Sequence, residues 1–128
     1  MPTESKKIVL IVEDEALLLQ ALTDAFTAEG FTTLGAKDGE EGLMVAESKH
    51  PDIILLDIIM PKMDGVTMLK QLRTDTWGKE VPVIVLTNLS DYNSVAETLS
   101  AGVHEFLVKS NWEIDRVVTV VKQKLGLV

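Results

Sequence analysis

Residues 53–56 form an uninterrupted aliphatic run, Ile-Ile-Leu-Leu, which ends in a single carboxylate at Asp57. A strand with no polar alternation is buried on both faces, as in a parallel sheet that helices cover. Pro61 and the pair Asp64-Gly65 favour a turn soon afterwards, so we expect Asp57 at the carboxyl end of the strand. Open α/β sheets commonly place their chemistry at that edge. The run therefore predicts a central strand and a candidate reactive side chain.

Other apolar runs alternate with segments that have apolar residues at helical spacing. Strong strands are predicted at residues 7–12 and 81–86 and a short one at 105–108, and a weaker run at 32–36 fits an edge strand. The predicted helices run from Glu15 to Gly30, from Asp38 to about Lys49, from Gly65 to a break at residues 77–80, from Ser90 or Asp91 to Gly102, and from Ser110 to Leu125. Asp38 with Glu41, and Ser110 with Glu113, have the spacing of capping boxes, so two of these helices are expected to begin there.

Five alternations of strand and helix with short loops require crossover connections, which are right-handed. They produce a parallel sheet with helices on both faces. We therefore predict a single α/β domain over residues 1–128, with a doubly wound, five-stranded, flavodoxin-like sheet and no output domain in this chain.

Composition and charge exclude several functions. The chain has no cysteine, so disulfides, thiolate metal sites and cysteine nucleophiles are excluded. Twenty acidic residues against 12 basic ones give a net charge of −8, which repels nucleic-acid backbones, so direct nucleic-acid binding is not expected. No run approaches the roughly 18 apolar residues of a membrane helix, and no signal-type segment follows the polar start. A soluble, cytoplasmic protein with no membrane association is expected.

Polar residues follow four of the predicted strands at the point where each strand ends. Because the carboxyl ends of parallel strands meet at one edge of a sheet, we expect these side chains to converge there. They are Glu13 and Asp14, Asp57, Thr87 and Asn88, and Lys109.

Clustered carboxylates disfavour joint ionisation unless a cation or a proton lies between them. Mg²⁺ takes one or two protein carboxylates together with phosphate oxygens, which suits a small open acidic pocket. With the metal in place, Asp57 can attack phosphorus to form an aspartyl phosphate. The Lys109 ammonium, the Thr87 hydroxyl and the Asn88 backbone N–H can neutralise charge on the phosphoryl oxygens.

Each of these residues also has an ordinary structural interpretation. The acids after residue 12 suit the first turn of a helix, Lys109 suits a solvated surface, and Phe106 suits a core. The functional interpretation is favoured because such polar residues occur together at the ends of four predicted strands.

The pattern resembles the receiver domains of bacterial two-component response regulators over essentially the whole chain. The resemblance rests on Glu13-Asp14, on residues 55–65 around Asp57, on Thr87 and on Lys109. It implies the strand order 2-1-3-4-5. It also implies that Asp57 is phosphorylated by a histidine kinase, a phosphotransfer protein or a small phosphodonor, as a stoichiometric acceptor rather than an enzyme.

The resemblance further implies a role for each site residue. Glu13, Asp14, Asp57 and the backbone carbonyl of Ile59 are the implied Mg²⁺ ligands. Thr87 and Lys109 are the implied phosphoryl contacts, and Phe106 changes rotamer when Thr87 moves. The fourth helix, fifth strand and fifth helix form the implied output surface, for an effector protein or a second copy of the chain.

Four positions depart from the commonest pattern of that family. Glu13 replaces an aspartate, Phe106 a tyrosine, Asn88 a small residue and Ser110 a proline. Without the tyrosine hydroxyl, a switch at Phe106 would depend on packing alone. Ile59 and Leu89 are expected to flank the phosphoryl group, and two apolar side chains cannot orient water, so slow autodephosphorylation is predicted.

Three other functions are alternatives to a phosphorylated receiver. A receiver-like interaction module that is never phosphorylated is the main alternative. A metal-dependent phosphatase with an aspartate nucleophile would normally have a second acid two residues after Asp57, where this chain has Ile59. A flavin- or nucleotide-binding protein would need a phosphate-binding loop where Glu13-Asp14-Glu15 stands.

Overall fold

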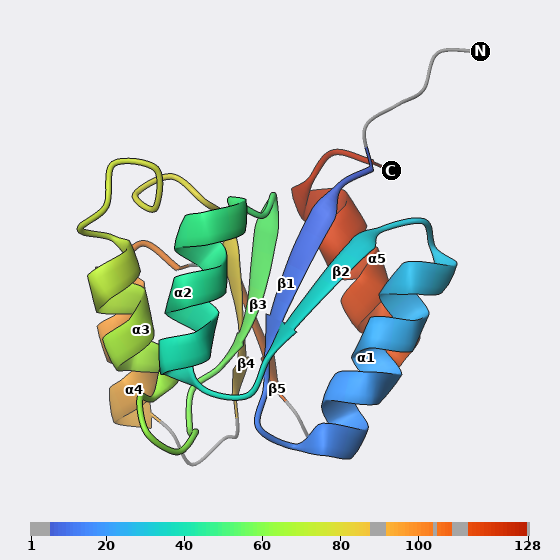
Figure 1. Cartoon of the computed structure of the whole chain (residues 1–128). Coiled ribbons are helices and arrows are strands. Elements are labelled where there is room, and N and C mark those ends of the chain that lie inside the picture. The colour runs from blue at the N-terminus through green and yellow to red at the C-terminus, as the bar shows by residue number, and fades with distance from the viewer. Residues whose placement is uncertain (1–5, 88–91, 104, 109–112, 128) are drawn as a thin grey trace.

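A computed structural model describes residues 6–87, 92–103, 105–108 and 113–127, with only the backbone of Thr87 and of residues 92–95. Strands and helices alternate along this part of the chain (Figure 1). The strands are β1 (Ile8–Val12), β2 (Thr32–Ala36), β3 (Ile53–Asp57), β4 (Val83–Thr87) and β5 (Glu105–Val108). The helices are α1 (Ala16–Ala28), α2 (Gly39–Lys49), α3 (Gly65–Leu72), α4 (Tyr92–Ser100) and α5 (Ile114–Lys124).

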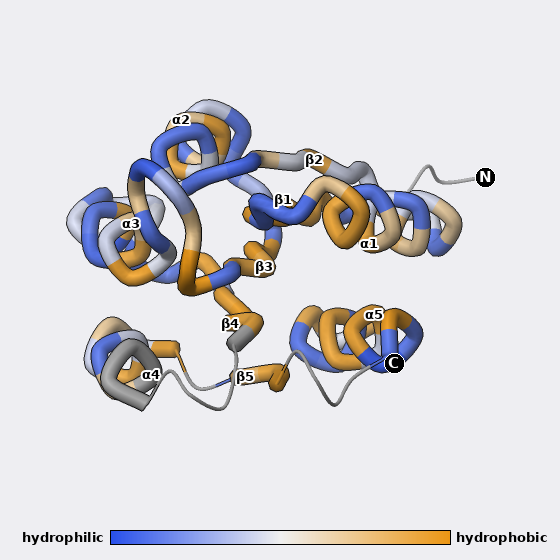
Figure 2. Tube along the Cα trace, turned by 90° about the horizontal axis from the view of Figure 1, so that it is seen from below, coloured by the Kyte–Doolittle hydropathy of each residue, from blue (hydrophilic) through white to orange (hydrophobic). Residues whose placement is uncertain are grey.

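The five strands form one parallel sheet in the order β2-β1-β3-β4-β5. Figure 2 looks onto the carboxyl ends of the strands and shows α2, α3 and α4 on one face of the sheet and α1 and α5 on the other. The doubly wound α/β fold expected from the sequence and the strand order implied by the family resemblance are therefore confirmed. The order reverses between β1 and β3, which is where such sheets leave a crevice.

The central strands carry apolar side chains on both faces, because each face is covered by helices. Along β3, Ile54 and Leu56 belong to the cluster under α2 and α3, whereas Ile53 and Leu55 belong to the cluster under α1 and α5. All four side chains are fully buried. This two-sided burial is the reason that β3 has no polar alternation.

Helix α2 lies close to the sheet at a glycine. A Cβ atom on Gly42 would lie 2.9 Å from Cγ2 of Val12 and 3.0 Å from Sδ of Met68. The glycine disfavours the helix by up to about 1 kcal/mol relative to alanine, but it permits this close packing.

Several predicted element ends are confirmed. Asp38 is the N-cap of α2 and accepts a hydrogen bond of 2.9 Å from the backbone N–H of Glu41. Gly30 follows the C-cap of α1 with a left-handed φ of 92°. Pro82 directly precedes β4, which begins at Val83 rather than at Val81 as predicted.

The predicted start of the last helix is wrong. Helix α5 begins at Ile114, and Glu113 is its N-cap, with extended backbone angles and no side-chain capping bond. The carbonyl of Glu113 accepts the first helical hydrogen bonds, from Arg116 and Val117. The helix therefore starts about one turn later than the Ser110–Glu113 spacing predicted. Ser110 itself lies outside the described residues.

None of the helices in the described ranges has the length and apolar character needed to cross a membrane.

Candidate metal centre

The ends of two neighbouring strands bring three carboxylates together. Val12 and Leu56 pair in the β1–β3 register, so Glu13 and Asp57 follow at the same level of the sheet. Carboxylate oxygens of Glu13, Asp14 and Asp57 all lie within 4.8 Å of one another. The Glu13 side chain is 0% exposed and that of Asp57 is 5% exposed, whereas Asp14 is exposed to solvent. This acidic triad can hold a metal ion, and it joins the three carboxylates that the sequence predicted to converge.

Glu13 is held by backbone contacts on both sides. Its N–H donates to the carbonyl of Ala36 at the end of β2, at 2.9 Å. Its Oε2 accepts from the N–H of Glu15, at 3.1 Å. Glu13, which stands where the family commonly has an aspartate, is therefore buried with a carboxylate oxygen close to those of Asp14 and Asp57. A cation bound between the three residues could use that oxygen as a ligand.

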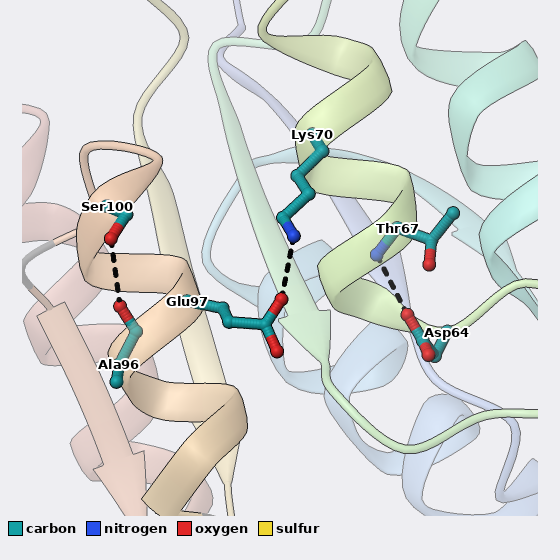
Figure 3. A network of polar contacts seen from close by, with 6 residues as sticks. All are labelled: Asp64, Thr67, Lys70, Ala96, Glu97 and Ser100. Atoms are coloured by element: carbon teal, nitrogen blue, oxygen red, sulfur yellow. Dashed lines mark hydrogen bonds and ion pairs between the residues drawn. The ribbon is translucent and has the colours of Figure 1, made fainter.

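The loop after β3 folds back tightly on the end of the strand. The N–H of Gly65 donates to the carbonyl of Ile58 at 2.8 Å. A Cβ atom on Gly65 would lie 2.2 Å from the carbonyl oxygen of Asp57, so only glycine fits there. Asp64 then caps α3 by accepting from the N–H of Thr67 at 2.8 Å (Figure 3). The turn predicted from Asp64-Gly65 is thus a close backbone contact beside the candidate reactive residue.

Within this loop the side chains of Ile58 and Met60 are buried, but that of Ile59 is 57% exposed. An exposed apolar side chain between two buried ones places Ile59 at the solvent side of the site. Its position is compatible with the predicted flanking role.

The remaining predicted site residues are only partly described. Thr87 closes β4, and in the β3–β4 register its neighbour Leu86 pairs with Asp57, so the Thr87 backbone lies just past the level of Asp57. Phe106 is half-buried on β5 and packs against the cluster under α2 and α3. The predicted contacts of Asn88, Leu89 and Lys109 fall outside the described residues and stay predictions.

Sequence reasoning missed one residue beside this site. Gly39, at the start of α2, donates its N–H to the carbonyl of Met63 in the loop after β3, at 2.8 Å. The pair Asp38-Gly39 was interpreted only as a helix start. The glycine after Asp38 is the only local signal of this contact, since the Met63 carbonyl that it meets comes from a distant part of the sequence.

The structure defines a doubly wound α/β protein with an acidic triad at the carboxyl edge that could hold a metal ion, and comparison with known sequences identifies the family. The sequence profile of the response regulator receiver domain matches residues 9–122. The chain therefore belongs to the response regulator receiver domain family.

Individual proteins that are similar in sequence or structure are also consistent with membership of this family. The chain is 38% identical over 106 residues to the probable transcriptional regulator ycf27 of Guillardia theta, which covers 83% of this chain and 41% of that protein. The structure is similar, with a TM-score of 0.87 and 25% identity, to a CheY-like receiver domain protein from Methanospirillum hungatei, covering 95% of both chains. It is also similar to a structure of a CheX–CheY complex with BeF3 and Mg²⁺ from Borrelia burgdorferi, with a TM-score of 0.81 and 34% identity, covering 93% of this chain and 89% of that one.

The chain spans less than half the length of the curated relatives that it matches, for example 42% of the ycf27 protein of Porphyridium aerugineum. The similarity therefore concerns their receiver part.

Proposed function

We propose that this domain is a phosphoacceptor in two-component signalling, and that Asp57 takes a phosphoryl group in a reaction that depends on Mg²⁺. The observation that carries the proposal is the triad of Glu13, Asp14 and Asp57, whose oxygens lie within 4.8 Å of one another at the carboxyl edge of the sheet. Membership of the receiver domain family supports it. Like charges this close are stabilised by a bound cation.

The residues present fit Mg²⁺. Three carboxylates on two neighbouring strand ends supply hard oxygen ligands, and the exposure of Asp14 leaves room for water and for phosphate oxygens. Glu13, Asp14, Asp57 and the backbone carbonyl of Ile59 would hold the ion. When bound, it would neutralise the acidic pocket so that an anionic phosphoryl group can approach.

In the proposed transfer, a carboxylate oxygen of Asp57 attacks phosphorus while the bond from phosphorus to the donor breaks. With phosphohistidine as donor, the P–N electron pair stays on the imidazole, which then takes up a proton. Positioning and charge stabilisation supply most of the catalysis of such transfers. Thr87, Lys109 and the Asn88 backbone N–H are the proposed contacts to the phosphoryl oxygens. The domain accepts one phosphoryl group and is not a turnover enzyme.

The partners follow from this chemistry. A histidine kinase or a phosphotransfer protein would donate the phosphoryl group, and the α4–β5–α5 face would transmit the change to an effector protein or to a second copy. Two described features lie on that face or beside it. Phe106 lies half-buried on β5, and Lys70 of α3 forms an ion pair of 2.7 Å with Glu97 of α4 (Figure 3).

Intact mass after incubation with Mg²⁺ and acetyl phosphate tests the proposal. The unmodified chain is expected to gain one phosphoryl group, and Asp57→Asn to gain none. Asp64→Asn is a matched control, because it changes a nearby acid that caps a helix and lies outside the triad. A chain that binds Mg²⁺ but gains no mass would instead support a receiver-like interaction module that is not phosphorylated.

The phosphorylated domain is proposed to lose its label slowly. The exposed Ile59 side chain cannot hydrogen-bond an attacking water. Substitution of Ile59 or Leu89 by a polar residue such as asparagine should shorten the half-life of the phosphoprotein, followed by loss of the added mass. A half-life that neither substitution shortens would contradict this role.

A further inference from the structure

The connection between β2 and α2 contacts the loop after β1, which carries Glu13 and Asp14, and the loop after β3, which follows Asp57. At one end, the carbonyl of Ala36 accepts from the N–H of Glu13 at 2.9 Å. At the other end, the N–H of Gly39 donates to the carbonyl of Met63 at 2.8 Å. Only two residues separate these anchor points. Residues 36–39 therefore form a short tie between the loop after β1 and the loop after β3.

Gly39 is required for this tie. A Cβ atom there would lie 2.4 Å from the carbonyl oxygen of Met63 and 2.9 Å from its Cβ, and both neighbours belong to the loop itself. Backbone atoms cannot give way as flexible side-chain ends do, so any larger residue must displace the loop or the start of α2.

A charged contact lies beside the same tie. Lys62 has a left-handed φ of 63°, and its Nζ lies 3.9 Å from Oδ2 of Asp38, the buried N-cap of α2. The loop between Ile58 and Gly65 is closed at its base by the Gly65–Ile58 hydrogen bond and is bonded from outside at Met63, whereas the exposed Lys62 adds only a weak contact. Ile59, whose carbonyl is a proposed ligand, lies between Ile58 and Met63.

We propose that Gly39 is a positioning residue for the metal centre, acting through Met63 to hold the loop after β3 at the distance from Glu13 that the cation requires. This rests on the proposed Mg²⁺ site. Groups that hold ligands in place without touching the metal typically change its affinity by about 10- to 100-fold when they are altered.

Two alanine substitutions in the same helix test the proposal. Gly39→Ala collides with the loop, whereas Gly42→Ala collides with the side chains of Val12 and Met68 and leaves the loop contact intact. Mg²⁺ titrations followed by amide NMR should show about tenfold weaker binding for Gly39→Ala and unchanged binding for Gly42→Ala. Urea unfolding of both variants measures the loss of stability separately.

The possible outcomes are distinct. Unchanged affinity in Gly39→Ala, or equal weakening in both variants, would overturn the positioning role. Absence of Mg²⁺ binding to the unsubstituted chain would instead refute the proposed function, and is measured first.

If Gly39→Ala does not fold, hydrogen exchange in the unsubstituted chain decides the question. Saturating Mg²⁺ should slow exchange of the Gly39 amide more than that of the His50 amide, which bonds to Ala46 at the far end of α2. Equal slowing of the two amides would contradict the tie.

Discussion

At the amino edge of the sheet, Asp52 and Arg73 are bonded to backbone groups, whereas at the carboxyl edge three carboxylates lie within 4.8 Å of one another. Asp52 Oδ2 accepts from the N–H of Ile8 at 2.7 Å, and its own N–H donates to the Ile8 carbonyl at 2.8 Å, which joins β1 to the start of β3. Asp52 and Arg73 at the amino edge are thus paired with backbone groups, whereas the acidic triad at the carboxyl edge gathers three like charges.

Arg73 shows how the amino edge is closed. Its guanidinium donates to the carbonyls of Gly78, Val81 and Ala101 at 2.7, 2.8 and 3.0 Å. Burial lowers the pKa of Arg73, and the nearby Glu80 raises it in part. One side chain thereby satisfies three carbonyls, two in the connection from α3 to β4 and one in the connection from α4 to β5. The role of Arg73 is therefore structural.

An aromatic contact lies at the same edge. The rings of His50 and Trp77 stack with centroids 4.3 Å apart and an interplanar angle of 5°. This contact joins the end of α2 to the turn that follows α3.

Charges paired with the backbone stabilise the scaffold, whereas the three gathered carboxylates form the site of the proposed function. Like charges that approach closely cost stability unless a ligand binds between them. The carboxyl edge is therefore expected to depend on a cation, and the amino edge is not.

The largest expected effect is at the amino edge. Arg73→Met keeps the aliphatic stem but removes the donors to three carbonyls, so the free energy of unfolding in urea should fall by about 2–4 kcal/mol. Mg²⁺ affinity should not change, because the carboxyl edge is intact. A loss below about 0.5 kcal/mol would show that Arg73 acts mainly through packing.

The next effect concerns the carboxyl edge. Mg²⁺ at about 100 times its Kd should raise the free energy of unfolding by about 2.7 kcal/mol, because the unfolded chain has no assembled site. Glu13→Gln should remove most of this gain, and Na⁺ at equal ionic strength provides the control. An equal gain in Glu13→Gln would place the bound ion elsewhere.

Replacing one aspartate by asparagine at each edge should change the free energy of unfolding by a smaller amount, with opposite signs at the two edges. Without Mg²⁺, Asp14→Asn relieves repulsion in the triad and should raise the free energy of unfolding by about 0.5–1 kcal/mol. Asp52→Asn weakens a hydrogen bond to Ile8 and should lower it by about 1 kcal/mol. Thermal unfolding with chelator present measures both. If both substitutions changed the free energy of unfolding in the same direction, the contrast between repelling carboxylates at one edge and a paired carboxylate at the other would be wrong.

The smallest change in the free energy of unfolding is expected for an ion pair that lies on the surface between helices α3 and α4. The Lys70–Glu97 ion pair joins α3 to α4 on the surface, where both side chains are half-exposed or more (Figure 3). Lys70→Ala should change the free energy of unfolding by about 0.5 kcal/mol or less. A double-mutant cycle with Glu97→Ala gives the coupling, and a value well above 1 kcal/mol would make this pair part of the scaffold.

The sequence predicted the fold well because two-sided burial and helical periodicity are local patterns. The unbroken run of β3 and the caps at Asp38 and Gly30 were confirmed for this reason. The start of α5 was not predicted correctly, because Glu113 occupies the N-cap without a capping side chain and so leaves no signal of its own.

The carboxylate triad was predictable because parallel strands share their carboxyl edge. The tie through Gly39 was not, because it joins residues far apart in the sequence, and its only local signal is one glycine. Arg73 likewise resembles an ordinary helix-end cation until its three carbonyl partners are in place.

The most direct test of the central claim is an Mg²⁺ titration followed by the amide NMR signals of the whole chain. Saturable shifts are expected at residues 13–14 and 57–60 and in the connection at 36–39, with little change at Asp52 and Arg73. Shifts of similar size at both edges, or none at the triad, would contradict a metal centre at the carboxyl edge.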